Sequence, residues 1–369
     1  MPTEANRMHE PASKLFNKRT PVLDGFRGLA ILLVIGYHYS GFFSFGWVGV
    51  DLFFVLSGFL ITGKLLESAG QKSYFYSFYL KRSLRIIPLY FFVLLFFFVV
   101  VPVFFHSVVT ASYKDLFKLQ GYYWTFTVNI YESFHGWPDN IALVPLWSLA
   151  CEMQFYLVWP FVVLLIYRHK KKYQLLAFAA LIISAVLFRL YGNFFSYPFP
   201  IYRYVLLPSR VDAFACGAIL AACIKNGWYT KFLQKGWVLS VVSLLLATAI
   251  MFNQHQLWYF GATLVGAYGY TLNALFWAGL IGFAWFVRNT ILEKALSVHW
   301  LTAAGRYSYA MYIFHVPVKI VLIKLLMGSF LPGYLITVMA VVVTFGCSFL
   351  SYHAIEKRFL YFKDNLKNN

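Results

Sequence analysis

The sequence has few charged residues and very few acids. Of its 369 residues, 12% are charged, and 13 Asp and Glu stand against 31 Lys and Arg. A soluble globular domain carries about 25% charged residues. Hydrophobic residues make up 61% of the chain, and the mean hydropathy is +0.67. This composition excludes an ordinary soluble domain and predicts an all-α polytopic integral membrane protein.

Cysteine is scarce, and the chain lacks the spacing of metal ligands. The four cysteines lie in apolar runs, so we interpret them as small buried hydrophobic residues. His, Asp, Glu and Cys form no cluster with ligand spacing, so we expect no metal. We also expect no cleavable signal sequence, because the polar N-terminus precedes an apolar run too long for a signal h-region. We expect that run to remain as the first membrane span.

The formal charge of +18 is the largest excess in the composition. Such a charge could indicate a nucleic-acid partner, but the basic residues cluster in short loops between apolar runs, as cytoplasmic loops do. We therefore expect no nucleic acid. Aromatic residues make up 21% of the chain, which fits the belts at membrane interfaces.

Runs of about 20 apolar residues, the length that crosses a bilayer, predict about ten spans. With the N-terminus inside, 24 Lys and Arg fall on the inner side and seven on the outer side, so both termini are predicted to be cytoplasmic. We expect a tail over 1–22, a membrane domain over 23–353 and a tail over 354–369. Residues 71–85 resemble an interfacial amphipathic segment, and the outer loop 106–145 could pack over the outer mouth. The predicted spans are 23–43, 47–67, 86–105, 146–167, 173–192, 204–224, 237–253, 259–287, 307–327 and 333–352.

Two ionisable residues stand in the first span, Arg27 near its cytoplasmic end and His38 in its outer half. Eleven steps of 1.5 Å separate them by roughly 16 Å along the helix axis. Eleven residues are close to three full turns, so both side chains point to nearly the same side. Ionisable groups inside a membrane are costly and usually mark function. We therefore predict a functional site along this face.

The other membrane charges fall into two layers. Arg82 and Arg85 lie with Arg27 near the inner face, where guanidinium groups suit phosphates, although an ordinary positive-inside belt is the alternative. In the outer layer we predict that His38 acts as a base, oriented by Glu152 or Asp51. Structural ion pairs are the alternative, and we favour it for Asp51, Arg210 and Asp212. His315, in mid-span, either packs helices or completes the site.

Five motifs, in order, resemble the acyltransferase-3 family of membrane O-acyltransferases. The resemblance covers about residues 20–360. One motif is a cation followed by a histidine in the first span, here Arg27 and His38. The second runs from Gly49 to Leu60 (GVDLFFVLSGFL). The others are Arg82, Arg85 and Pro88; Ser148, Glu152 and Tyr156; and Ser308, Tyr309, Tyr312 and His315. The tail departs from the family pattern, since Arg358 stands where Pro is usual.

The resemblance implies an enzyme of the bacterial inner membrane. Its donor would be a cytoplasmic acyl-CoA, with acetyl as the expected group, and its acceptor a hydroxyl of a glycan or small molecule on the outer side. Membrane lipid would be its surroundings, with no permanently bound cofactor. We assign His38, Glu152 and Asp51 to catalysis, with His38 as general base or acyl carrier. The donor is assigned to Arg27, Arg82 and Arg85, and the substrate to Arg210, Asp212, Tyr309 and His315.

Some family members carry an additional soluble esterase-like domain. Since the sequence to Asn369 contains none, we expect transfer to finish in the membrane domain or with a separate partner.

Three other interpretations remain. Buried charges and broken helices also mark transporters, here of a glycan precursor or an anionic solute. A structural protein of envelope synthesis could use the same polar groups to hold helices together. An acyltransferase of different architecture could be built on His315 instead of His38.

Overall fold

The computed structural model describes residues 16, 20–39, 44–104, 110–194, 200–228, 230–253, 263–287, 289–326, 331–359 and 361. Within these ranges the chain is helical, with no strand. Most of the two predicted tails, the first residues of the predicted span 259–287 and part of the outer loop lie outside the described residues.

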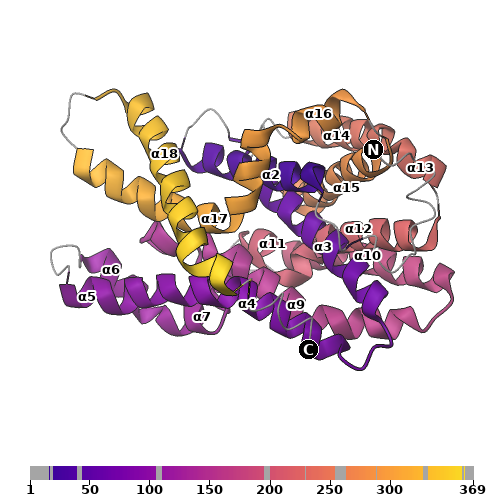
Figure 1. The fold of residues 1–369 in the computed structure, drawn as a ribbon, viewed down its shortest axis with the longest axis horizontal. Coiled ribbons are helices and arrows are strands. Elements are labelled where there is room, and N and C mark those ends of the chain that lie inside the picture. Colours follow the sequence, from indigo (N-terminus) through magenta and orange to yellow (C-terminus); the bar gives the residue numbers. More distant parts are fainter. Residues whose placement is uncertain are drawn as a thin grey trace.

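Seventeen α-helices are described, and Figure 1 shows their arrangement. Short π-helical or 3-10 turns join or extend them: η1 (Phe96–Val100), η3 (Ile141–Leu143), η4 (Val265–Gly269) and η5 (Tyr352–Glu356). The α-helices are α2 (Pro21–Tyr39), α3 (Val48–Ser68), α4 (Tyr74–Leu95), α5 (Val101–Phe104), α6 (Ala111–Lys118), α7 (Gln120–Trp124), α8 (Val128–His135), α9 (Leu146–Tyr167), α10 (Lys171–Phe194), α11 (Tyr202–Val205), α12 (Leu207–Asn226), α13 (Thr230–Gln234), α14 (Gly236–Asn253), α15 (Tyr270–Phe286), α16 (Ile291–Leu296), α17 (His299–Leu326) and α18 (Gly333–Ser351).

Eight helical segments of the described chain are long and apolar enough to cross a membrane. They coincide with eight of the predicted spans, and the other two predictions fall on α14 and on η4 with α15. An all-α polytopic membrane protein is therefore confirmed. Residues 71–85, predicted as an interfacial segment, are continuous with the span that follows. From Tyr74 they belong to α4, which continues through η1 and α5 to Phe104 as one helical segment.

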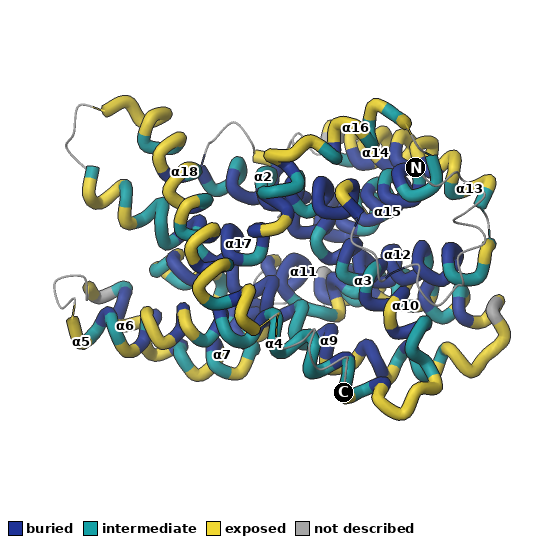
Figure 2. The backbone as a smooth tube through the Cα atoms, in the orientation of Figure 1, coloured by how far each residue is buried: buried dark blue, intermediate teal, exposed yellow. Residues whose placement is uncertain are grey.

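Helix α3 lies at the centre of the molecule. Buried residues make up 78% of its most apolar stretch, against 17% for α18 and 22% for α10, which lie at the periphery (Figure 2). Helix α3 packs most extensively on α12, and α2 packs on α17. Glycine permits both close approaches, because a Cβ at Gly58 or Gly217 would overlap the facing backbone, as it would at Gly28 or Gly305.

Candidate active site

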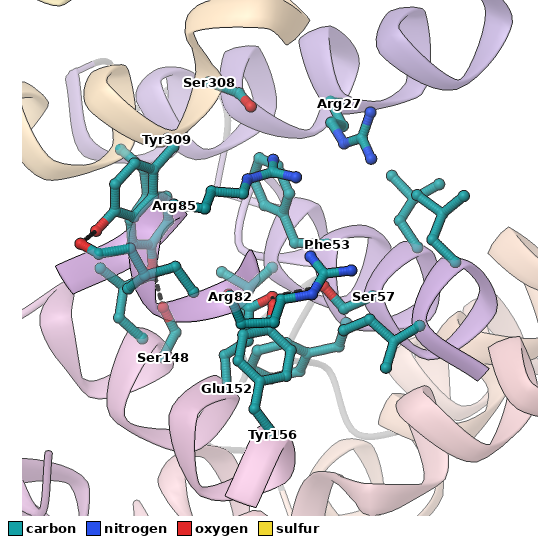
Figure 3. Close-up of a pocket in the computed structure, with 18 of the residues that line it drawn as sticks. Arg27, Phe53, Ser57, Arg82, Arg85, Ser148, Glu152, Tyr156, Ser308 and Tyr309 are labelled. Carbon is teal, nitrogen blue, oxygen red and sulfur yellow. Dashed lines mark hydrogen bonds between the residues drawn. The ribbon is translucent and has the colours of Figure 1, made fainter. Parts of the chain in front are cut away.

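A cavity of about 110 Å³ lies between α2, α3, α4, α9 and α17 (Figure 3). Helix α3 contributes a stripe with helical spacing, Phe53, Ser57, Leu60 and Lys64. These four are half-buried or exposed, whereas most of α3 is buried. The least buried face of the central helix thus forms one wall of the cavity.

Basic side chains from three helices gather at this cavity. Arg27 from α2, Lys64 from α3, and Arg82 and Arg85 from α4 all line it. The three guanidinium groups extend toward the same space in Figure 3. The structure therefore brings together all three residues assigned to the donor. A group of this kind suits a phosphorylated ligand, because guanidinium binds phosphate oxygens bidentately.

Glu152 is the carboxylate among the residues lining the cavity. The hydroxyl of Ser57 donates to its Oε1 at 2.5 Å, and the hydroxyl of Tyr156 donates to the same atom. Arg82 lies over the ring of Tyr156, with its guanidinium carbon 5.5 Å from the centroid, and interacts electrostatically with Glu152. Glu152 is thus fixed at the wall beside the cations.

His38 meets His315. Their ring centroids are 4.9 Å apart, and His315 is fully buried. The Nδ1 of His315 is 2.6 Å from the carbonyl oxygen of Tyr312, while its Nε2 has no hydrogen-bond partner among the described residues. The expected partner Glu152 is not among the contacts of His38 in the described chain, where the ring neighbours of His38 are Tyr37 and His315. The side chain beside His38 is therefore that of His315, where we expected Glu152.

Two reciprocal hydrogen bonds hold the histidines in register. Lys319 of α17 donates from Nζ to the carbonyl oxygen of His38 on α2. In the opposite direction, the hydroxyl of Tyr39 on α2 donates to the carbonyl oxygen of His315 on α17 at 2.6 Å. Each histidine backbone is therefore held by a side chain of the other helix. We call this arrangement of Tyr39, His38, His315 and Lys319 the histidine clamp.

Tyr312 connects the cavity to the histidine clamp. It lines the cavity, hydrogen-bonds to the hydroxyl of Ser148 at 2.6 Å, and has its ring centroid 5.5 Å from that of His315. Tyr309, one turn earlier on α17, also lines the cavity and donates to the carbonyl oxygen of Ile86 at 2.6 Å. Helix α17 thus runs from the basic cavity to the histidine pair, as α2 does.

Asp51, Arg210 and Asp212 lie in a separate cluster. Asp51 forms an ion pair with Arg210 and accepts a hydrogen bond from Asn273. Asp212 pairs with Arg189 at 2.9 Å, not with its sequence neighbour Arg210. All four ion-pair partners are fully buried, and none lines the cavity. These contacts are those of structural ion pairs, the alternative that the sequence favours for them.

Comparisons with known proteins identify the family of this chain. The sequence model of the acyltransferase-3 family, described as an acyltransferase domain, matches residues 21–353. The chain belongs to the acyltransferase-3 family. No solved structure matches the chain.

Relatives of this acyltransferase-3 chain carry names of O-acetyltransferases. The candidate peptidoglycan O-acetyltransferase YrhL of Bacillus subtilis is 30% identical over 91% of this chain and 54% of its own length. The peptidoglycan O-acetyltransferase OatA of Listeria monocytogenes is 37% identical over 43% of this chain and 26% of its own. The O-acetyltransferase OatA of Staphylococcus aureus is 26% identical over 93% and 58%. This chain spans about half the length of YrhL and of the Staphylococcus OatA.

Several residues of the acyltransferase-3 site are missing from the sequence prediction. Ser57 lies inside a quoted motif, and Lys64 completes its stripe two turns later, so helical spacing could have found both. Lys319 lies one turn after His315 and could have been found in the same way. Glu132 of α8, a buried carboxyl that does not line the cavity, could not be found from spacing, because its burial depends on how the outer loop packs. That carboxyl is fully buried, and neither oxygen has a hydrogen-bond partner among the described residues.

Proposed function

We propose that the protein is a membrane O-acetyltransferase of the bacterial inner membrane. It would move an acetyl group from cytoplasmic acetyl-CoA to a hydroxyl on the outer side. The single observation that carries this proposal is the position of four cations around one cavity, three helical turns along α2 from a pair of histidines. The family match and the names of the relatives support the reaction class.

The basic residues suit the donor end of the site. Arg82 and Arg85 would bind the phosphates of CoA, with Arg27 and Lys64 beside them. A cavity of about 110 Å³ is small beside the roughly 300–1,000 Å³ of drug-sized ligand pockets. The nucleotide would therefore stay at the basic mouth, while the narrow pantetheine arm enters. Roughly 16 Å of helix between Arg27 and His38 sets the length that this arm must cover.

The histidine clamp would supply the acid–base chemistry. An acceptor hydroxyl is a weak nucleophile at neutral pH and needs a base. In our mechanism His38 removes the hydroxyl proton as the oxygen attacks the thioester carbonyl. The tetrahedral intermediate then expels the CoA thiolate, which takes the proton from His38. His315 lies where it can orient His38, and the acetyl group could instead pass through His38 as a carrier.

The acceptor is proposed as a glycan of the cell envelope. Two of the named relatives are described as acting on peptidoglycan, which makes a sugar hydroxyl on the outer side the first substrate to test. His38, three turns from the basic end of α2, lies toward the side that the positive-inside count predicts to be outer.

The testing experiment follows acetyl-CoA turnover by purified protein in lipid nanodiscs. Thiol release and radiolabelled acetyl on protein and on added glycan would be measured for wild type, His38→Ala and Arg85→Ala. His353→Ala, at an exposed position, is the matched control. We expect His38→Ala to bind donor without turnover, Arg85→Ala to lose donor affinity, and His353→Ala to behave as wild type. A wild type that moves a solute into liposomes and never consumes acyl-CoA would favour the transporter instead.

A further inference from the structure

A second, larger hollow lies away from the active site, between α10 and α14. Helix α10 packs on α12 and helix α14 packs on α15, so α12 and α15 form the floor between them (Figure 1). This crevice contains two cavities, of about 1020 and 610 Å³. The larger cavity is at the upper end of the roughly 300–1,000 Å³ typical of ligand pockets.

The same helix faces line both cavities. On α10 the lining runs from Leu175 and Ala179 in the larger cavity to Val186 in the smaller. On α14 it runs from Leu239 to Leu246, again seven residues apart. Seven residues are two helical turns, so the side chains lie on one face. The cavities are therefore the inner and outer parts of one crevice.

The depth of the larger cavity matches one leaflet of a bilayer. Its wall runs from Cys216 on α12 to Gly227, the residue that ends this helix, which is eleven steps or about 16 Å. Half of the roughly 30 Å hydrocarbon core is about 15 Å. Its lining is apolar except near one end, where Lys172 and Trp228 lie.

That end is strongly basic. Segments 168–172 (RHKKK) and 225–235 (KNGWYTKFLQK) flank it, and together they carry seven Lys and Arg with no Asp or Glu. Lys172 and Lys231 are exposed, and Lys231 is next to Phe232, which lines the cavity. Trp residues are enriched at the membrane interface, so Trp228 places this end at headgroup level. Long basic side chains there attract anionic headgroups.

We propose that the larger cavity is a binding site for one anionic phospholipid of the cytoplasmic leaflet. An acyl chain would lie along α12, and the phosphate of the headgroup would contact Lys172 and Lys231. An apolar crevice alone would accept any lipid, so the rim is what selects an anionic one. This site is independent of the proposed transfer reaction.

The test measures retained lipid by native mass spectrometry, using phosphatidylglycerol and phosphatidylcholine with identical acyl chains. Variants are Lys172→Gln with Lys231→Gln at the rim, and Ala179→Phe inside the cavity. The matched control is Lys72→Gln with Lys357→Gln, which removes the same charge at exposed positions elsewhere.

We expect wild type and control to retain one phosphatidylglycerol in preference to phosphatidylcholine. Since a basic residue near the surface contributes about 1 kcal/mol, the rim variant should lose roughly tenfold or more of that preference. Ala179→Phe should lose both lipids. Equal retention of the two lipids by wild type, or equal loss in the rim and control variants, would overturn the proposal. Both rim lysines are exposed, so we expect their substitution to leave folding intact. The comparison of the rim and control variants therefore decides the proposal even if Ala179→Phe does not fold.

Discussion

Two regions of this molecule hold charged side chains within the helical bundle, and the regions differ in how those charges are balanced. In the cluster of α3, α10, α12 and α15, Asp51 pairs with Arg210 and Asp212 with Arg189, all without exposed surface. At the cavity, four cations and one carboxylate form the lining. Each charge in the first region has a partner of opposite sign. The second region concentrates positive charge in its lining, although Arg27 also pairs there with Asp24 at 2.9 Å.

The difference is one of charge balance: positive and negative charges are matched in the buried cluster, and cations outnumber the carboxylate in the cavity lining. A buried ion is costly unless an opposite charge and hydrogen bonds compensate it. Within the protein, each charge of the cluster has an ion-pair partner, and Asp212 and Arg189 also hydrogen-bond to each other and to Thr271. At the cavity, the excess positive charge is the feature that an anionic substrate would complement. An excess of charge of one sign is therefore a better indication of a ligand site than the presence of charged residues in a span.

Removing the proposed base tests the catalytic side of this comparison most strongly. His38→Ala should lower kcat by about 10³-fold, within the range that general bases contribute. Donor affinity should remain, because the basic residues lie three turns away. Turnover and acetyl-CoA binding are measured separately, with His353→Ala as control. Retention of full turnover would move the catalytic role to His315.

Breaking an ion pair tests the structural side. Asp51→Ala leaves Arg210 buried and uncompensated, which should cost about 3–5 kcal/mol of stability. Thermal unfolding in nanodiscs measures this loss, and Asp139→Asn, an exposed acid of the outer loop, is the control. An Asp51→Ala protein with normal stability and no turnover would return Asp51 to the catalytic group.

Neutralising the cavity cations should weaken donor binding and leave stability nearly unchanged. Arg82→Ala and Arg85→Ala should raise the donor KM about 10- to 100-fold, the value of a hydrogen bond between charged groups. Stability should change little, because these residues are only half-buried. Acetyl-CoA titration with parallel thermal unfolding distinguishes the two regions. Large destabilisation with an unchanged KM would mean that these arginines belong to the structural class.

Loosening the histidine clamp should have a smaller effect. Lys319→Met removes the hydrogen bond to the carbonyl of His38 and should lower kcat about tenfold, because misplaced catalytic groups lose rate. The donor KM should stay constant, and Lys319→Arg should restore part of the rate. Lys324→Met, five residues further along α17 and exposed, is the control. A change confined to KM would contradict a positioning role for Lys319.

The smallest expected effect concerns pH and stability. Burial raises the pKa of the Glu132 carboxyl well above its usual range. The folded state then binds more protons than the unfolded state above about pH 4.3, so stability falls as the pH rises. Glu132→Gln should remove a dependence of up to about 1.4 kcal/mol per pH unit. Unfolding between pH 5 and 8 measures it, and a parallel pH dependence in both proteins would contradict it.

Much of the fold was predictable because membrane spans carry a strong signal. The predicted span 146–167 has the same bounds as α9. The cation group was also predictable, since Arg27, Arg82 and Arg85 stand in quoted motifs. The ion-pair partners were not predictable. Arg210 and Asp212 are close in sequence, but Arg210 forms its ion pair with Asp51 of α3. Such partners depend on how helices distant in sequence cross. For the same reason, the neighbour of His38 could not be read from its own helix.

Arg27 and His38 stand on one unbroken helix, so α2 fixes the distance between them. No loop intervenes, so under the proposed function the distance from the donor phosphates to the imidazole would not adjust to a longer or shorter donor arm. One residue inserted between them would move His38 by about 1.5 Å and turn it by about 100°, away from His315 and from the face that it shares with Arg27. Under the proposed function, the register of this helix would tie recognition of the donor to the place where its acyl group is released.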